Sequence, residues 1–200
     1  MFSSMEWLNE PPAWQDAGDV LTLRTGAETD FWRKTHYGFI RDTGHFLHRE
    51  VTGDFTAAVT FSGEFTTLYD QAGLMLRLNE RTWIKAGVEY SDGALQLSTV
   101  VTNGTSDWSL RPLGIGGNQV TLQLSREANA VHVSYLEPQG RRNRWSSLRL
   151  AYLPLEDHLC RIGIMACSPT RAGLDMEFSD FRLCPSAGID LHPHDPADAD

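Results

Sequence analysis

The sequence predicts an all-β protein, an antiparallel β-sandwich of the jelly-roll type with about a dozen strands. Two observations support this fold class. Apolar and polar residues alternate with a period of two along most of the chain, as in strands with one buried face. Short turns rich in Gly, Asn, Asp and Pro separate these stretches, and no stretch keeps a helical period of 3.6 residues over three turns.

In chain order, the alternation begins after a segment, residues 6–14, whose two adjacent prolines exclude a helix interior or a central strand. Residues 29–39 are rich in aromatic side chains, and we expect the end of this segment to be extended. The expected strands are 20–24, 46–51, 54–61, 69–78, 83–90, 95–102, 119–124, 131–135, 148–152, 162–166 and 174–178.

The composition is that of one globular domain. The chain has 200 residues, of which 41% are hydrophobic and 22% charged, so it can bury a sizeable core. We place a single sandwich domain at residues 1–185 and expect the polar, proline-rich residues 186–200 to form a disordered tail. The net charge of −9 argues against nucleic acid or an anionic membrane as a partner, because both require a basic surface. The oligomeric state stays open.

The sequence shows neither a signal peptide nor a membrane span. The N-terminus has no basic region followed by an apolar run, and no stretch approaches the roughly 18 apolar residues of a membrane helix. The three cysteines are odd in number and late in the chain. Two of them, Cys160 and Cys167, fit apolar strand positions, so we expect buried thiols rather than disulfides or metal ligands. We therefore expect a cytoplasmic protein without a metal or cofactor.

The hairpin of residues 69–78 and 83–90 has one aliphatic face and one chemically mixed face. We pair Leu78 with Thr82, because this leaves an allowed three-residue loop and keeps like charges apart. Strand 95–102 then pairs with the second strand of the hairpin. The mixed face carries four rows: Gln71, Glu89 and Gln96; Gly73, Gly87 and Ser98; Met75, Lys85 and Val100; Arg77, Trp83 and Thr102.

The row of two glycines and a serine predicts a trough across this face. Glycine inside a strand often marks the close approach of a ligand or another backbone. The charged, amide and indole side chains beside the row suit a carbohydrate or a similar small polar ligand on the concave sheet. Alternatively, an aromatic side chain from a neighbouring loop fills the trough. The expected ligand-binding residues are Gln71, Gly73, Arg77, Trp83, Lys85, Gly87, Glu89, Gln96 and Ser98, and the expected rim residues are Trp32, His36, His45, Asp107 and Trp108.

Two other functions stay open besides non-catalytic binding. A glycosidase-like enzyme needs two carboxyl groups about 5–9.5 Å apart. Glu89 is the best acid or base, with Asp70 or Asp107 as its partner, although the alternation turns Asp70 away from the mixed face. The same face also suits a protein-interaction or regulatory module of carbohydrate metabolism. The sequence contains no phosphate loop, no Gly-x-Ser-x-Gly and no His-Glu-x-x-His motif.

Six motifs carry a resemblance to a known family. They are WLNEPP at 7–12, TDFWRKTHYGF at 29–39, DTGHF at 42–46, YDQAGLM at 69–75, WIKAGVE at 83–89 and SDWS at 106–109. Through them the chain resembles domain-of-unknown-function family 1349, whose fungal branch is described as regulation-of-enolase proteins. The resemblance covers about residues 6–183 and implies a concanavalin A-like lectin/glucanase sandwich. It implies no catalytic residues, and because the fold hosts lectins, glucanases and interaction domains, it leaves the function open.

Overall fold

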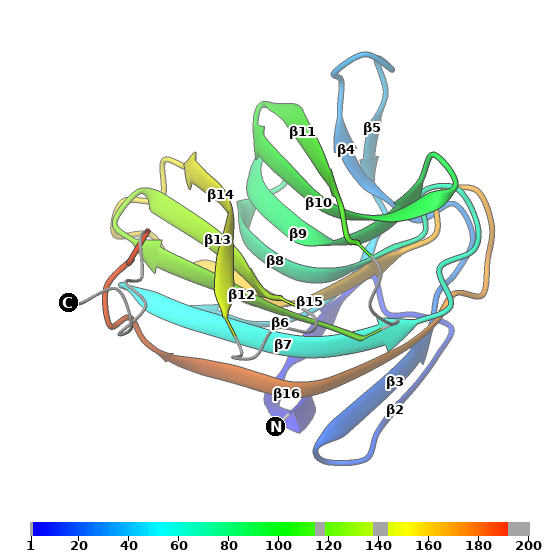
Figure 1. Ribbon diagram of the computed structural model, residues 1–200, viewed down its shortest axis with the longest axis horizontal. Helices are drawn as coiled ribbons and strands as arrows, with labels where there is room; N and C mark the ends of the chain where they lie inside the picture. Colours follow the sequence, from blue (N-terminus) through cyan, green and yellow to red (C-terminus); the bar gives the residue numbers. More distant parts are fainter. Residues whose placement is uncertain (1, 115–118, 138–143, 192–200) are drawn as a thin grey trace.

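Strands make up almost all of the regular structure, which confirms the predicted all-β class. The computed structural model describes residues 2–114, 119–137 and 144–191. These residues form two seven-stranded antiparallel sheets that pack face to face and a separate two-stranded hairpin (Figure 1). A single 3-10 turn, Phe2–Ser4, precedes the first strand.

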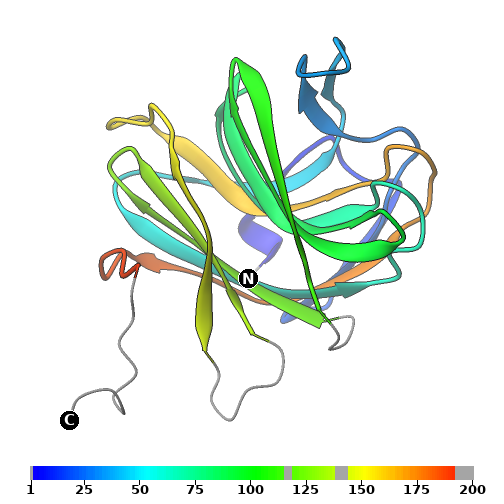
Figure 2. The ribbon, with the colours of Figure 1, turned by 45° about the horizontal axis from the view of Figure 1, so that its top comes forward.

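Each sheet combines strands from distant parts of the chain. Sheet A has the spatial order β1 (Glu6–Leu8), β6 (His45–Val51), β15 (Cys160–Cys167), β8 (Gln71–Asn79), β9 (Thr82–Ser91), β10 (Ala94–Asn103) and β11 (Thr105–Pro112). Sheet B has the order β14 (Trp145–Tyr152), β13 (Ala130–Leu136), β12 (Gln119–Glu127), β7 (Phe55–Gly63), β16 (Asp175–Pro185), β3 (Val20–Arg24) and β2 (Ala13–Asp16). The separate hairpin consists of β4 (Phe31–Arg33) and β5 (Ile40–Asp42), and it projects beyond the two sheets (Figures 1 and 2).

The main core lies between the sheets. From sheet A it takes the aliphatic face of the β8–β9 hairpin, including Leu74, Ile84 and Val88, as the alternation predicted. A second, smaller apolar cluster forms on the outer face of sheet A, the face turned away from sheet B. Its buried members are Phe31, Trp32, Phe46, Met75, Trp83, Val100, Met165 and Cys167. Sheet A is therefore covered on both faces over part of its area.

The predicted strand register is confirmed at all four rows of the mixed face. The predicted loop of this hairpin is wrong, because Asn79 and not Leu78 pairs with Thr82. Leu78 is the extra residue of a β-bulge, which leaves a two-residue turn at Glu80 and Arg81. The Asn79 side chain accepts the Arg81 N–H at 2.8 Å, the local bond through which asparagine favours such turns.

The remaining sequence predictions concern the cysteines, a membrane span and the C-terminal tail. Cys160 and Cys167 are buried free thiols, as predicted, whereas Cys184 is exposed. No helix within the described ranges has the length and hydropathy of a membrane span. Of the predicted tail, Gly188–Leu191 border a cavity on sheet B, and residues 192–200 lie outside the described residues.

Candidate ligand pocket

The outer face of β8, β9 and β10 is covered by one of the chain segments that run from one sheet to the other. This connection, residues 25–44, leaves β3 in sheet B, forms the β4–β5 hairpin and enters β6 in sheet A. The Arg33 N–H of β4 donates to the Ser106 hydroxyl of β11 at 2.9 Å, which fastens the hairpin to the edge strand. The connection divides the mixed face into a closed half and an open half.

The closed half contains Met75, Arg77 and Trp83. The Phe31 ring of the connection packs edge-on against Trp83, which is only 1% exposed. Arg77 forms a two-pronged ion pair with Asp42 of β5, with N–O distances of 2.7 and 2.8 Å. Both predicted ligand residues in this half are thus occupied within the protein. Phe31 of β4 covers this half, whereas the alternative prediction placed an aromatic side chain over the row of Gly73, Gly87 and Ser98.

Close backbone contact explains the opposed glycines. A Cβ atom on Gly73 would lie 2.1 Å from the Ala86 carbonyl oxygen, and one on Gly87 would lie 1.9 Å from the Ala72 carbonyl oxygen. Both positions therefore exclude any side chain because of the neighbouring strand, which is one of the two reasons that glycine occurs inside strands. Neither glycine lines the open cavity described below, so the expected trough along this row is not part of that cavity.

The open half contains Gln71, Lys85, Glu89 and Val100, which form the floor of a cavity of about 270 Å³. Aromatic side chains from three separate segments form its walls. The wall residues are Trp32, Tyr37, Phe39, Tyr69 and Trp108, and the remaining lining residues are Glu28, Asp30, Arg41, Pro169 and Thr170. Of the predicted residues, the structure brings together Gln71, Lys85, Glu89, Trp32 and Trp108 in this cavity.

Buried charges lie at the floor of the pocket. The Lys85 ammonium, 3% exposed, pairs with the Asp30 carboxylate of the connection at 3.0 Å. Burial alone would lower the pKa of Lys85, but Asp30 raises it above its ordinary value. Burial also raises the pKa of Glu89, and the opposing effects of Lys85 and of the Ser98 hydroxyl only partly offset this. The site therefore holds an ion pair beside a carboxylate that is incompletely compensated.

Ser98 and Gln96 of β10 lie beside the floor on the same face of sheet A. The Ser98 hydroxyl donates to Glu89 Oε2 at 3.0 Å and accepts the Trp108 indole N–H at 3.2 Å. This relay fixes both the carboxylate and the indole that stands over it. Gln96 pairs with Glu89 across the strands but does not line the cavity.

Four of the aromatic walls form a closed arrangement, which we call the aromatic cage: Trp32, Tyr37, Tyr69 and Trp108. The Trp32 ring centroid lies 5.7 Å from that of Tyr37 and 6.5 Å from that of Trp108, and the Trp108 centroid lies 6.4 Å from that of Tyr69. All three contacts are edge-to-face. The Tyr37 and Tyr69 hydroxyls, 3.1 Å apart, close the circuit, and their hydrogen bond raises the pKa of Tyr69 to about 12.

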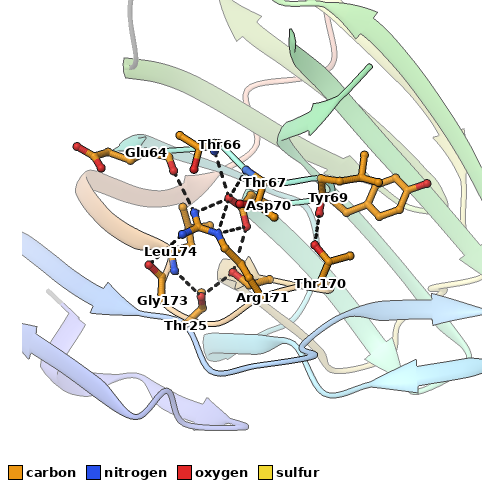
Figure 3. Close-up of polar contacts among 12 residues, drawn as sticks. Thr25, Glu64, Thr66, Thr67, Tyr69, Asp70, Thr170, Arg171, Gly173 and Leu174 are labelled. Atoms are coloured by element: carbon orange, nitrogen blue, oxygen red, sulfur yellow. Dashed lines mark hydrogen bonds and ion pairs between the residues drawn. The ribbon is translucent and has the colours of Figure 1, made fainter. Parts of the chain in front are cut away.

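Asp70 is a positioning residue and not part of the cavity. Its fully buried carboxylate binds the Arg171 guanidinium and accepts the backbone N–H groups of Thr66 and Thr67 (Figure 3). The Tyr69 ring points away from this ion pair (Figure 3). Asp70 thereby joins the loop that ends at Tyr69 to the loop that carries Thr170, and both loops contribute to the pocket wall.

The other predicted rim residues lie outside the cavity. Asp107 is exposed and pairs with Arg149 of β14 at 3.3 Å, because the alternation of β11 turns it away from the side of Trp108. His45 is buried: its Nε2 accepts the Gly26 N–H, and its Nδ1 lies 2.6 Å from the Asn9 carbonyl oxygen. His36 is exposed, with its ring against that of Tyr37. Among the described residues, no three His, Cys, Asp or Glu side chains gather as metal ligands.

Several wall residues were not predicted. Tyr37, Phe39 and Asp30 all belong to the aromatic-rich segment 29–39, whose composition was the available signal. Tyr69 reaches the pocket from a left-handed backbone conformation, with φ of 67°, which non-glycine residues rarely adopt. Alternation within strands cannot place this side chain, since Tyr69 lies in the turn before β8, separated from it by Asp70.

Comparison with known proteins gives consistent results. Residues 7–186 match the family model described as "Protein of unknown function (DUF1349)". The chain is 44% identical over 187 residues to "Regulation of enolase protein 1" of Saccharomyces cerevisiae, with 93% of this chain and 92% of that protein covered.

Solved structures show the same fold. A crystal structure of a functionally unknown Saccharomyces cerevisiae protein is 41% identical, with a TM-score of 0.87 over 94% of this chain and 99% of that chain. A GH43 protein from Bacillus licheniformis has a TM-score of 0.67 over 91% of this chain and 37% of its own, at 16% identity, which is a likeness of fold alone. By its near full-length match to the family model and to the yeast protein, the chain belongs to the DUF1349 family.

Proposed function

We propose that this protein is a non-catalytic, cytoplasmic binding protein for a carbohydrate or a similar small polar molecule. The observation that carries the proposal is the cavity of about 270 Å³, in which aromatic walls surround a buried carboxylate and an ion pair. Small-molecule sites are commonly concave and mostly apolar, with a few converging polar groups. The volume lies near the lower end of the usual range of about 300–1,000 Å³, so the ligand is small.

The contacts at the floor support binding through hydroxyl or amine hydrogens. Among the described residues, the Ser98 hydroxyl donates to Glu89 Oε2 and the Trp108 indole N–H also stabilises the charged carboxylate, so Oε1 is the acceptor offered to a ligand. The Gln71 amide N–H donates to the Tyr69 carbonyl oxygen at 3.2 Å, which leaves its own carbonyl oxygen as a second acceptor. An apolar CH face of the ligand would contact Trp108 or Trp32.

The arrangement of carboxylates favours binding over glycoside hydrolysis. A glycosidase needs a second carboxyl group opposite the acid or base. Asp70 is bound by Arg171, Asp107 lies on the other side of β11, and Asp30 neutralises Lys85. Glu89 therefore stands in the pocket without either of the partners expected for catalysis.

A regulatory interaction module is the second candidate. Phe39 and Ile40 of the hairpin are 40% and 47% exposed, so they offer apolar contact area beside the pocket mouth. The name of the yeast relative refers to the regulation of enolase. Size-exclusion chromatography of this protein mixed with purified enolase tests this candidate, since a shared peak that Ile40→Asp abolishes would support it and separate elution would contradict it.

A thermal-shift screen tests the proposed binding function. A panel of sugars, sugar phosphates and amines would be applied to the wild type, to Trp108→Ala and to Trp14→Ala. The last is a matched control, because Trp14 is exposed to a similar degree, 42% against 37%, but lies on sheet B. We expect at least one compound to stabilise the wild type and the control but not Trp108→Ala. The proposal fails if no compound stabilises the wild type, or if a hit stabilises all three proteins equally.

A further inference from the structure

The pocket floor offers two acceptor oxygens to a ligand, on Glu89 and Gln71, beside the donors of Lys85 and Gln71. The Trp108 indole N–H is used by Ser98, and the Trp32 indole N–H is used by the Thr35 carbonyl oxygen at 3.0 Å. One of the two Gln71 amide hydrogens is donated to the Tyr69 carbonyl oxygen. Glu89 Oε1 and the Gln71 carbonyl oxygen accept no hydrogen bond from the described residues. These two acceptor oxygens suit a ligand group that brings its own hydrogen-bond donors.

The buried charges of the floor sum to one negative charge. Lys85 and Asp30 neutralise each other through their ion pair at 3.0 Å. Glu89, which is 3% exposed, keeps a carboxylate without a dedicated cation. Arg41 lines the pocket but is exposed, and its guanidinium lies over the outer Phe39 ring at 5.4 Å. Because buried charges are normally paired, a positively charged ligand would complete the site.

The aromatic cage adds a second, independent attraction for a cation. Cation–π attraction acts within about 6 Å of a ring centroid and is strongest for Trp. The sides of the cage that join Trp32, Tyr37, Trp108 and Tyr69 measure 5.7–6.5 Å, which is the same length scale. Cages of this composition are the recognised means of holding alkylated ammonium groups. The cage walls and the Glu89 floor therefore select for the same charge.

We propose that the ligand of this pocket is a small organic cation, a protonated or methylated amine on a short or cyclic polar skeleton. Its ammonium group lies between the cage rings and faces Glu89, and its hydroxyl groups meet Gln71 and the rim. This inference rests on the proposed binding function and narrows it, since neutral sugars of the same size lack the group that the floor and the cage both favour.

Two matched pairs of probes test the role of charge in the wild-type protein. Choline is compared with 3,3-dimethyl-1-butanol, which has the same shape without the charge, and glucosamine at slightly acidic pH is compared with glucose. We expect calorimetry to show at least one cation binding about tenfold or more tighter than its neutral counterpart, which corresponds to a cation–π and ion-pair gain near 1.4 kcal/mol. Because these measurements use only the wild-type protein, a variant that fails to fold cannot affect their outcome.

Variants then assign the effect to the pocket. We expect Glu89→Gln and Trp108→Ala each to weaken the binding of the cation about tenfold. The control Glu177→Gln, the same change on the exposed surface of sheet B, and Trp14→Ala should leave it unchanged. Equal weakening by the controls would overturn the assignment to this pocket.

The possible failures separate the two proposals. If a neutral probe binds as tightly as its charged partner, or if glucose binds and glucosamine does not, the charge selection is wrong while the binding function survives. If none of the four probes binds, the cation class is likewise overturned, and the wider screen with Trp108→Ala still decides whether the pocket binds any small molecule.

Discussion

The two halves of the outer face of β8, β9 and β10 are built from the same strands in the same register, yet one is closed and the other open. In the closed half, Phe31 covers Trp83, and Asp42 binds Arg77. In the open half, the connection contributes Asp30 to Lys85 and then turns outward, so that Tyr37 stands at the wall of a cavity instead of filling it.

This difference shows that the strand register determines which side chains share a face, whereas the connection, residues 25–44, determines which of them border the cavity. Arg77 and Glu89 have equivalent positions by alternation, and both are buried. Of the two, only Glu89 borders the cavity, because Asp42 of the connection occupies Arg77. Substitutions on the two halves should therefore have opposite consequences for stability and binding.

The largest difference in stability and binding effects is expected between alanine substitutions of Trp83 in the closed half and Trp108 in the open half. Trp83→Ala should lower the free energy of unfolding by about 3 kcal/mol, since it leaves a cavity under Phe31, although it also removes an indole N–H without a partner in the structure. Trp108→Ala should cost only about 1–2 kcal/mol, because Trp108 is 37% exposed, but it should weaken ligand binding about tenfold. Urea denaturation and calorimetry measure the two effects, and equal losses of stability would contradict the comparison.

Removing the Asp30 carboxylate of the connection should lower the free energy of unfolding nearly as much as Trp83→Ala does. Asp30→Asn leaves the buried Lys85 ammonium without its counter-ion, and we expect a loss of about 3 kcal/mol. The matched control is Asp175→Asn, which breaks an ion pair with Arg24 whose side chains are both more than half exposed, and it should cost less than about 1 kcal/mol. Denaturation curves that shift equally for both variants would show that the Lys85–Asp30 pair adds nothing to stability.

A smaller effect is expected at the glycines between the two halves. Gly87→Ala places a methyl group against the Ala72 carbonyl oxygen and should cost about 2 kcal/mol through strand displacement. Gly26→Ala is the control, because its Cβ would meet only ordinary contacts beginning at 3.6 Å. Thermal unfolding distinguishes them, and a Gly87→Ala protein as stable as Gly26→Ala would refute close backbone contact as the reason for the glycine.

The smallest effect concerns pH. Burial lowers the pKa of His45, and its hydrogen bond with Asn9 offsets this only in part. The folded state then binds fewer protons than the unfolded state, so the stabilisation from His45 is complete above its ordinary pKa of 6.5 and is lost as the pH falls through the lower folded value. The stability advantage of the wild type over His45→Gln should shrink below pH 6.5, and an advantage that grows on acidification would reverse the assignment.

The sequence was sufficient for the fold class, for the strand register and for three of the four residues of the pocket floor. Alternation determines which residues share a face, so Gln71, Lys85 and Glu89 were placed correctly. It carries no information about a connection that crosses that face, and for this reason Arg77 and Trp83 were expected at the surface of a site. The bulge at Leu78 and the backbone angle of Tyr69 depend on tertiary contacts and were likewise out of reach.

The connection between the sheets has one more consequence, for the evolution and engineering of specificity. The tip of the β4–β5 hairpin, residues 34–38, belongs to neither sheet, yet it supplies Tyr37 to the wall of the pocket. Changing the length of an exposed loop costs little stability, because the closure entropy grows only slowly with loop length. Insertions or replacements at this tip can therefore resize the pocket and retune its selectivity while the sandwich stays intact.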